Sequence, residues 1–384
     1  MFVYVGAITA TYVEPQPPLY LRPDPVPREG NMGEQNEGIS VFVQDDDTGA
    51  LTHIQAVRGL RNPTFLAIHP SLPFLYAAER ETTTWGPVET IAGVITTLAI
   101  GSDGRLTLVD RQPAGGGATY LSVHPSGRYL FTAMPAPRSV SVFPIQDDGR
   151  VGPPTDVVQH HGRGVNTITS EQPFPHSVRA DLPGHRVLAC DMGLDRVMVY
   201  DLDSASGRLR PSPHPFVQLS SGAGPRHLWV HPSNRFVYTV NEIDSTVSAF
   251  SYDADTSAMR IVHTIGTRPD GFTGHNSGAQ IVVDPSGRFL YSSNRGHNSI
   301  AMFSIDQESG RPRLIGLEST QGETPRNFNI DPAGRFLLVA NVGSNNLVNF
   351  RVDGDTGRLQ PTGHVMSSPR PVCVVYRDAG ANRT

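Results

Sequence analysis

One phrase recurs along the chain, and its spacing constrains the fold more than any other feature. It consists of an apolar residue, His or Asp, Pro, two small or polar residues, Arg, and then a run of apolar residues. Copies of the phrase begin at or surround Val123, Val230, Val283, Ile330, Pro70 and Pro183. Successive prolines of the phrase lie 47 to 58 residues apart. A repeat of about fifty residues with strand-like patterning is typical of β-propellers, in which each repeat forms one blade.

Each period contains segments for four antiparallel strands. An inner strand precedes the Pro-containing turn, as at 225–230, and a second strand follows it, as at 236–240. A third strand alternates apolar and polar residues, as at 247–250, and a fourth follows turns rich in Asp and Gly. Period-2 alternation between such turns predicts antiparallel meanders.

The two ends of the chain supply one more blade. Residues 2–5 resemble a second strand without an inner strand, and residues 369–376 resemble an inner strand without a second strand. Pairing these ends would close the ring without a free sheet edge. We therefore predict an all-β fold, a single seven-bladed propeller domain over 1–384 with four antiparallel strands per blade. The segments 13–37 and 159–175 do not fit the period and are predicted to be loop insertions.

The basic residues exclude several kinds of chemistry. All 31 are Arg, so Schiff-base catalysis, pyridoxal phosphate chemistry and a P-loop, which need Lys, are excluded. The net charge is −5, without a basic patch, so we expect no nucleic-acid partner. The start of the chain lacks a signal-peptide pattern, and no apolar run is long enough to cross a membrane. With only two Cys, we expect a cytoplasmic protein without disulfides or membrane contact.

Polar residues are concentrated where a site would form. In an antiparallel blade, the start of the inner strand and the end of the second strand lie at the same end, so residues there should converge on the channel mouth. The starts of inner strands carry His176, Arg226, His227, Gln280, Arg326 and Asn327. The ends of second strands carry Asp191, Glu242, Arg295 and Asn341.

A turn-forming role is the alternative for some of these residues. Asn and Asp at strand ends often begin tight turns for backbone reasons, which applies to Asp191 and Asn341. His176 and Glu242 occur once each at positions where a structural repeat requires no such variation, and Arg226 is grouped with them. These three residues are the stronger candidates for function.

At these positions the chain resembles the seven-bladed lactonase family, which includes the bacterial propeller-type 6-phosphogluconolactonases and the carboxy-cis,cis-muconate lactonizing enzymes. The resemblance covers nearly the whole chain. Its motifs are Pro175-His176-Ser177-Val178, Gly224-Pro225-Arg226-His227, Val240-Asn241-Glu242, Ser293-Asn294-Arg295-Gly296 and Pro325-Arg326-Asn327-Phe328.

The resemblance implies a catalytic group, and position in the blades implies a substrate-binding group. The family's site of one His, two Arg and one Glu falls on His176, Arg226, Glu242 and Arg295. From their places at the channel mouth, and not from the resemblance, we expect the substrate-binding residues to be His227, Gln280, Arg326, Asn327, Asn341 and Asp191. Where relatives commonly carry Ala followed by an acid, this chain has Ala279 followed by Gln280. That difference leaves open whether the substrate is the same.

Three functions remain open from the residues alone. Lactone hydrolysis needs a base, Glu242 or His176, to activate water, and cations to stabilise the oxyanion. The same groups could run a muconate-type lactonizing reaction as a cycloisomerase, and a non-catalytic binding propeller is a third possibility. We expect the first, a metal-independent lactonase of carbohydrate metabolism that acts on an anionic sugar lactone without a cofactor. The adjacent His160 and His161 have poor chelate spacing, and no metal site is predicted.

Overall fold

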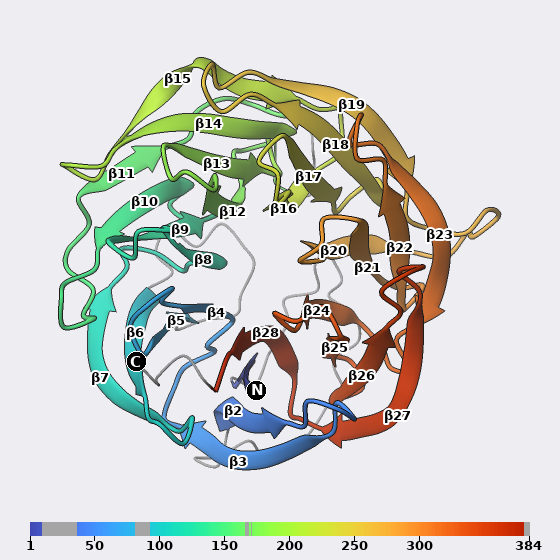
Figure 1. The fold of residues 1–384 in the computed structure, drawn as a ribbon. Coiled ribbons are helices and arrows are strands. Elements are labelled where there is room, and N and C mark those ends of the chain that lie inside the picture. The colour runs from blue at the N-terminus through green and yellow to red at the C-terminus, as the bar shows by residue number, and fades with distance from the viewer. Residues whose placement is uncertain (10–36, 81–92, 166–168, 170, 380–384) are drawn as a thin grey trace.

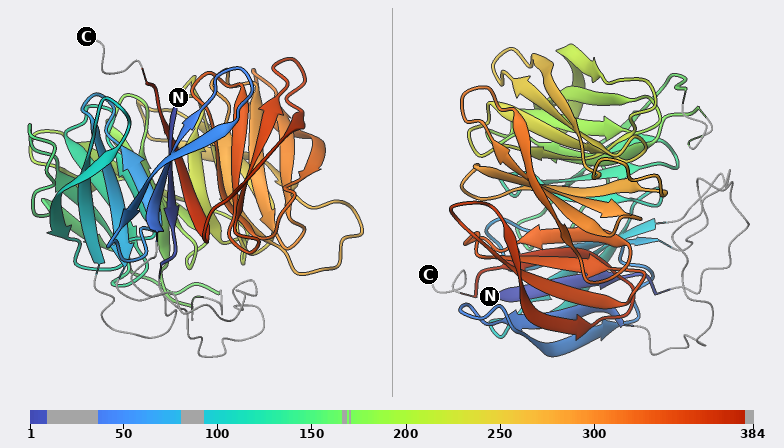
Figure 2. Two further views of the ribbon diagram at one scale, coloured as in Figure 1. Left: turned by 90° about the horizontal axis from the view of Figure 1, so that it is seen from below. Right: turned by 90° about the vertical axis from the view of Figure 1, so that its right-hand side faces the viewer.

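The computed structural model describes residues 1–9, 37–80, 93–165, 169 and 171–379. Within these residues, seven four-stranded antiparallel sheets stand in a ring around a central channel (Figure 1). Seen from the side, the ring is a thick disc, and the strands run across its thickness (Figure 2). The seven-bladed all-β fold predicted from the repeat is therefore confirmed.

Each blade contributes one strand to each layer of the ring. The inner strands are β28 (Pro371–Arg377), β4 (Phe65–Ile68), β8 (Tyr120–Val123), β12 (Pro175–Ala180), β16 (Pro225–Val230), β20 (Ser277–Val283) and β24 (Pro325–Ile330). The second strands are β1 (Phe2–Ala7), β5 (Phe74–Arg80), β9 (Tyr129–Met134), β13 (Arg186–Asp191), β17 (Phe236–Asn241), β21 (Phe289–Arg295) and β25 (Phe336–Asn341).

The outer half of each blade follows the same order. The third strands are β2 (Glu37–Gln44), β6 (Gly93–Ile100), β10 (Ser139–Pro144), β14 (Arg196–Asp203), β18 (Thr246–Tyr252), β22 (Ser299–Ile305) and β26 (Asn346–Val352). The outermost strands are β3 (Leu51–Arg58), β7 (Leu106–Pro113), β11 (Asp156–Gln159), β15 (Arg208–Gln218), β19 (Met259–Gly266), β23 (Pro312–Ser319) and β27 (Leu359–Ser367).

Burial follows the position of the strand in the blade. All six residues of β17 are buried, whereas β27 is exposed along most of its length. Second strands lie between two neighbouring blades and are apolar on both faces, as the adjacent and fully buried side chains of Val237 and Tyr238 in β17 illustrate. The core therefore lies between the blades, where apolar area is removed from water on both sides of each sheet.

The ring closes through its two chain ends. Strand β1 pairs with β28, and the register places Val3 opposite Tyr376 and Val5 opposite Val374. The sheet order β28-β1-β2-β3 puts both ends in one blade, as the sequence predicted (Figure 1). This pairing covers the facing edges of β1 and β28, which would otherwise be unpaired.

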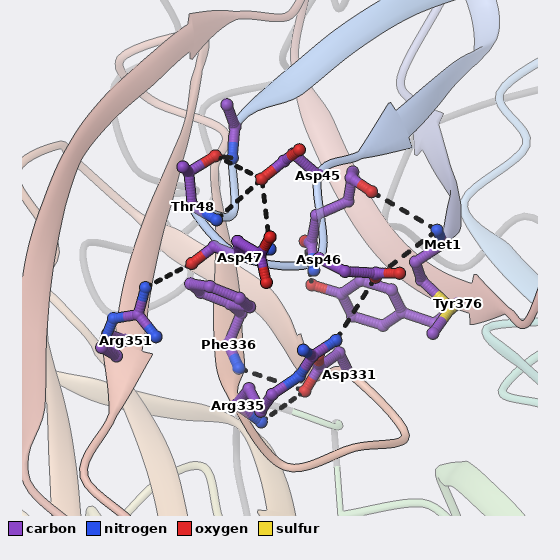
Figure 3. Close-up of polar contacts among 12 residues, drawn as sticks. Met1, Asp45, Asp46, Asp47, Thr48, Asp331, Arg335, Phe336, Arg351 and Tyr376 are labelled. Atoms are coloured by element: carbon purple, nitrogen blue, oxygen red, sulfur yellow. Dashed lines mark hydrogen bonds and ion pairs between the residues drawn. The ribbon is translucent and has the colours of Figure 1, made fainter.

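Side-chain contacts also join the closing blade to the preceding blade, at the end of the ring opposite the starts of the inner strands. Arg335, in the turn after β24, lies 3.3 Å from the Asp46 carboxylate in the β2–β3 turn. Arg351 of β26 donates to the carbonyl of Asp47 in the same turn (Figure 3). These polar contacts tie the last complete blade to the shared one.

Hydrogen bonds between blades repeat around the ring. The Tyr76, Tyr238 and Tyr291 hydroxyls donate to the carbonyls of Gly149, Gly310 and Gly357, each in an outer turn of the next blade. The histidines of the repeated phrase make a matching set at the inner turns. The Nε2 atoms of His69, His124 and His231 lie 2.8 to 3.0 Å from the carbonyl oxygens of Gly127, Gly184 and Gly287. The repeated polar residues at this end thus connect blades.

The predicted insertions are only partly visible. Residues 13–36 of the first one lie outside the described residues. In the second, β11 extends to Gln159 and β12 begins at Pro175, so the insertion is the connection between two blades. The described part of the chain contains no helix with the length and hydropathy that a membrane crossing requires.

Candidate active site

A polar cavity lies at the end of the channel where inner strands begin and second strands end. The empty space between its lining residues, counted together with the adjoining open solvent, is about 330 Å³. Six blades contribute to its wall, with Thr64, Phe65, Arg80, Thr119, His176, Arg226, His227, Arg326, Asn327 and Val372. Five of the ten predicted site residues line this cavity, namely His176, Arg226, His227, Arg326 and Asn327, and five do not, namely Asp191, Glu242, Gln280, Arg295 and Asn341.

Irregular strand pairing turns the side chains of three wall residues towards the cavity. In β12, Pro175 pairs with Asp191 and Ser177 with Cys190, so His176 has no partner across the ladder. The register shifts in the same way at Arg226 in β16 and at Arg326 in β24. A bulge leaves one residue outside the ladder and turns its side chain away from the regular alternation. The same kind of β-bulge thus directs His176, Arg226 and Arg326 into the cavity.

Glu242 is held between two arginines, one of which, Arg226, lines the cavity. Its Oε2 lies 2.7 Å from Nε of Arg226, and its Oε1 lies 2.9 Å from Nη2 of Arg295. Burial alone would raise the pKa of Glu242, but the positive charges of Arg295 and Arg226 outweigh it and hold the pKa below its usual value. Glu242 is therefore an ionised carboxylate with an ion pair at each oxygen.

Two neutral histidines lie beside this ion-pair cluster. The ring centroids of His176 and His227 are 5.2 Å apart, and both side chains are buried. Burial and the adjacent charge of Arg226 lower the pKa of both imidazoles well below the usual value. Within the described residues, Nδ1 of His176 has no hydrogen-bond partner. His176 is thus a free-base imidazole in the cavity wall at neutral pH.

His227 is fixed by contacts on every side. Its Nδ1 lies 2.6 Å from Oε1 of Gln280, and its Nε2 lies 3.1 Å from Nη1 of Arg226. The Tyr120 ring packs against it with a centroid distance of 5.0 Å, and Tyr120 in turn packs on Phe65 at 4.1 Å. These aromatic rings give His227 an apolar surrounding, which explains why its charged form is disfavoured.

The opposite wall adds positive charge. Arg80, at the end of β5, is 7% exposed, and burial together with the charge of Arg326 lowers its pKa to about 10. It remains a cation at neutral pH. The guanidinium groups of Arg80, Arg226 and Arg326 line the cavity, and Glu242 pairs with Arg226 and Arg295. Such a group of guanidinium side chains suits an anionic ligand.

Asp191 and Asn341 are not brought into the cavity wall. The carboxylate of Asp191 accepts hydrogen bonds from the backbone of Phe174, Gly193 and Leu194, and its Oδ2 lies 2.6 Å from Nδ1 of His160. Asn341 is fully buried and donates to the carbonyl of Thr320. Both side chains hold turns at strand ends, the alternative that their position in the sequence had left open.

Sequence reasoning missed part of the wall. Arg80 ends the second strand β5, a position that faces the channel mouth, but it was not among the predicted site residues. Thr64 and Thr119 precede β4 and β8 and carry no distinguishing pattern. In the 159–175 segment, His160 is held by Asp191 and by the Tyr200 hydroxyl at 2.9 Å, so it anchors the connection to its blade.

The residues described show no arrangement for a metal ion. Groups of three or more His, Cys, Asp or Glu side chains placed to hold a metal are absent from the described ranges. The polar groups of the cavity are instead guanidinium and imidazole groups, with one carboxylate in ion pairs. Their chemistry is that of anion binding and proton transfer.

The sequence is similar to those of several named proteins. The chain is 33% identical to a 6-phosphogluconolactonase of Bacillus subtilis over 295 residues, 76% of this chain and 81% of the relative. It is 32% identical to a 6-phosphogluconolactonase of Serratia proteamaculans over 77% of this chain and 82% of that one.

Solved structures extend the similarity over almost the full length. The periplasmic gluconolactonase of Pseudomonas aeruginosa matches with a TM-score of 0.84 and 28% identity, covering 97% of this chain and 98% of that one. A protein from Lactobacillus plantarum matches with a TM-score of 0.83 and 26% identity, covering 98% and 99%. The family model described as lactonase, 7-bladed beta-propeller, matches residues 5–376. The chain therefore belongs to the seven-bladed β-propeller lactonase family.

Proposed function

We propose that this chain hydrolyses an anionic sugar lactone of the 6-phosphogluconolactone type. The observation that carries the proposal is a cavity wall that holds a neutral His176 together with Arg80, Arg226 and Arg326, with Arg226 also paired to the ionised Glu242. Guanidinium groups bind phosphate and carboxylate in bidentate fashion, and they stabilise a developing oxyanion. The names of the relatives support a phosphorylated substrate.

His176 is the better candidate for the base. Both oxygens of Glu242 are engaged by guanidinium groups, whereas Nδ1 of His176 has no hydrogen-bond partner among the described residues. A neutral imidazole in the cavity wall can accept a proton from water without first losing one. Glu242 then acts by holding Arg226 and Arg295 in place.

The reaction can be written with these groups. Water attacks the carbonyl carbon of the lactone while the imidazole of His176 takes one of its protons. Arg226, which lines the cavity, stabilises the negative charge that forms on the carbonyl oxygen. The bond between the carbonyl carbon and the ring oxygen then breaks, and the proton on His176 moves to that oxygen. The product is a sugar acid, which releases a proton to solvent at neutral pH.

The remaining wall residues bind the rest of the substrate in this proposal. Arg80 and Arg326 would hold a second anionic group, with His227 and Asn327 between the two walls. Gln280 contacts His227 rather than lining the cavity. We assign Asp191 and Asn341 to turn formation, because their side chains are hydrogen-bonded within strand ends.

A cytoplasmic location is part of the same proposal. Cys190 and Cys373 are both buried as free thiols, as expected for a reducing compartment. The periplasmic gluconolactonase of similar fold makes the periplasm the alternative. Cell fractionation of the native producer separates the two, and recovery of the chain in the periplasmic fraction would contradict the cytoplasmic location.

A lactone panel in a pH-stat tests the function. It should contain 6-phosphoglucono-δ-lactone, glucono-δ-lactone and a carboxymuconolactone, each corrected for spontaneous hydrolysis. We expect the phosphorylated lactone to be preferred by about 10-fold or more in kcat/KM, because a charge-assisted hydrogen bond contributes that much. Equal rates on both sugar lactones would contradict the anionic substrate. Activity confined to the muconate compound would support the cycloisomerase, and no activity on any compound would support a binding propeller.

A further inference from the structure

The protonation of His227 can be read from its partners. An arginine side chain only donates hydrogen bonds, so Nε2 of His227 must accept the one from Nη1 of Arg226 at 3.1 Å. The proton of the neutral ring is then on Nδ1, which donates to Oε1 of Gln280 at 2.6 Å. The two contacts together define one tautomer, the one with hydrogen on Nδ1.

Gln280 is itself held in one orientation. Its Nε2 donates to the carbonyl of Phe328 at 3.3 Å, which leaves Oε1 to face the imidazole. Its backbone N–H donates to the Ser293 hydroxyl at 3.1 Å instead of to a strand partner, because the ladder is interrupted between Gly278 and Ile281. The side chain is 6% exposed. An acceptor fixed in this way selects the tautomer of His227.

The protonation state of His227 depends on its neighbours, and therefore on which side chain stands at position 280. Positive charges of Arg226, Arg295 and Arg326 act on the imidazole, and the rings of His176, Tyr120 and Phe65 pack against it. Gln280 contributes a neutral oxygen to this environment. A carboxylate in the same place would favour the imidazolium form, which has no lone pair to accept from Arg226.

We propose that Gln280 is a positioning residue, which keeps His227 as a neutral acceptor and thereby holds Arg226 in its ion pair with Glu242. Arg226 has two further contacts that depend on this pose, with Nε 2.7 Å from Glu242 and Nη1 at the carbonyl of Ala279. A protonated His227 would place an N–H against Nη1 of Arg226 and push the guanidinium from that pose. Gln280 acts through His227, and the effect on turnover rests on the proposed lactonase function.

Three variants test the proposal. Gln280→Glu keeps the shape and adds a negative charge, and Gln280→Met keeps the length and removes the acceptor. Gln360→Glu makes the same charge change on the exposed outer strand β27, far along the chain from the cavity residues, and serves as the matched control. Two quantities are measured between about pH 5 and pH 9, the long-range ¹⁵N–¹H correlations of the histidine rings and the profile of kcat/KM.

The expected results differ among the variants. In the unchanged chain, His227 should show the Nδ1–H tautomer without titrating over this range. In Gln280→Glu it should become protonated near neutral pH, and kcat/KM should fall by about 10-fold between pH 8 and pH 6 beyond the fall in the parent. In Gln280→Met the tautomer signature should be lost, and kcat/KM should fall at every pH without a new inflection. Gln360→Glu should match the parent.

Two outcomes would overturn the proposal. One is an Nε2–H tautomer, or titration of His227 near neutral pH, in the unchanged chain. The other is a Gln280→Glu profile that superimposes on the parent profile. The ring spectra need no substrate, so failure of the lactonase assignment would leave them unaffected and would be seen separately in the lactone panel.

Discussion

Arg295 reaches from one blade to Glu242 in the next, with 2.9 Å between Nη2 and Oε1. Arg226 completes the pair from the blade of Glu242 itself, with 2.7 Å between Nε and Oε2. The carboxylate thus joins a bulged inner strand to the second strand of the neighbouring blade. A site built in this way depends on the closed ring, because its charges come from separate sheets.

Removal of Arg295 should damage binding and turnover together. Arg295→Ala deletes one of the two ion pairs of Glu242, the carboxylate that also holds the cavity residue Arg226. We expect KM to rise and kcat to fall, for a combined loss of about 100-fold in kcat/KM. Steady-state kinetics on the phosphorylated lactone measure both constants. Arg313→Ala, on the exposed face of β23 in the same blade, is the control and should keep parental constants.

Arg80 should distinguish phosphorylated from unphosphorylated substrates. Arg80→Met removes a buried guanidinium from the wall that Arg326 shares, while its apolar stem is kept. KM for the phosphorylated lactone should rise by about 10-fold or more, whereas KM for glucono-δ-lactone should change little. Equal changes in KM for both lactones would place Arg80 outside the phosphate-binding wall.

The repeated histidines should make stability depend on pH. Burial lowers the pKa of His69, His124 and His231 in the folded chain relative to the usual value of 6.5. The unfolded chain therefore binds more protons below about pH 6.5, so the free energy of unfolding should fall as the pH drops from about 6.5 towards the lower folded values. Above that pH their contribution should be constant.

Urea unfolding at a series of pH values measures this dependence. The variant His124→Asn should be less stable at pH 8, because it loses the contact with Gly184, and it should show a shallower slope of stability against pH below 6.5. An unfolding free energy that rises as the pH falls from 6.5 to 5.5, with the parental slope in the variant, would contradict this assignment.

Replacing a turn glycine by alanine should lower the free energy of unfolding most where the glycine contacts a neighbouring blade. Gly310 has φ of +70°, and an added Cβ would overlap the ring of Phe236. Gly271 has φ of +78° with no atom within 4 Å of an added Cβ, so it isolates the backbone strain. We expect Gly271→Ala to cost roughly 1 kcal/mol and Gly310→Ala roughly 1 to 3 kcal/mol more in unfolding free energy. Equal costs in denaturant unfolding would show that the Phe236 contact is unimportant.

The fold was predictable because the repeated phrase encodes a local unit with a fixed role. Its apolar residue ends the inner strand, its His or Asp binds the turn, and its Arg precedes the second strand, as around His124 and Asp331. The end segments were recognisable as half-blades because strand type shows in the composition. That the two end segments share one blade followed from the need to close the ring, whereas the register that pairs Val3 with Tyr376 came from the structure.

The site was predictable in location but not in detail. Strand direction alone places His176 and Glu242 at the same end of the ring, independently of how their side chains are oriented. The bulges that direct His176 and Arg226 into the cavity each shift the strand register by one residue. The alternation of apolar and polar residues in the sequence does not show such a shift. Asp191 ends a second strand just before Met192, as Asn241 does before Glu242, and only tertiary contacts decide that its carboxylate binds a turn.

The central claim is that a neutral His176 and an ionised Glu242 between two arginines perform the reaction. Steady-state kcat of His176→Gln and Glu242→Gln on the preferred lactone tests it most directly, with folding checked by circular dichroism and Gln360→Glu as the control. We predict that His176→Gln lowers kcat by about 10² to 10⁴, as for the loss of a general base, and that Glu242→Gln lowers it by about 100-fold through loss of the two ion pairs. Near-parental kcat in both folded variants would contradict the account.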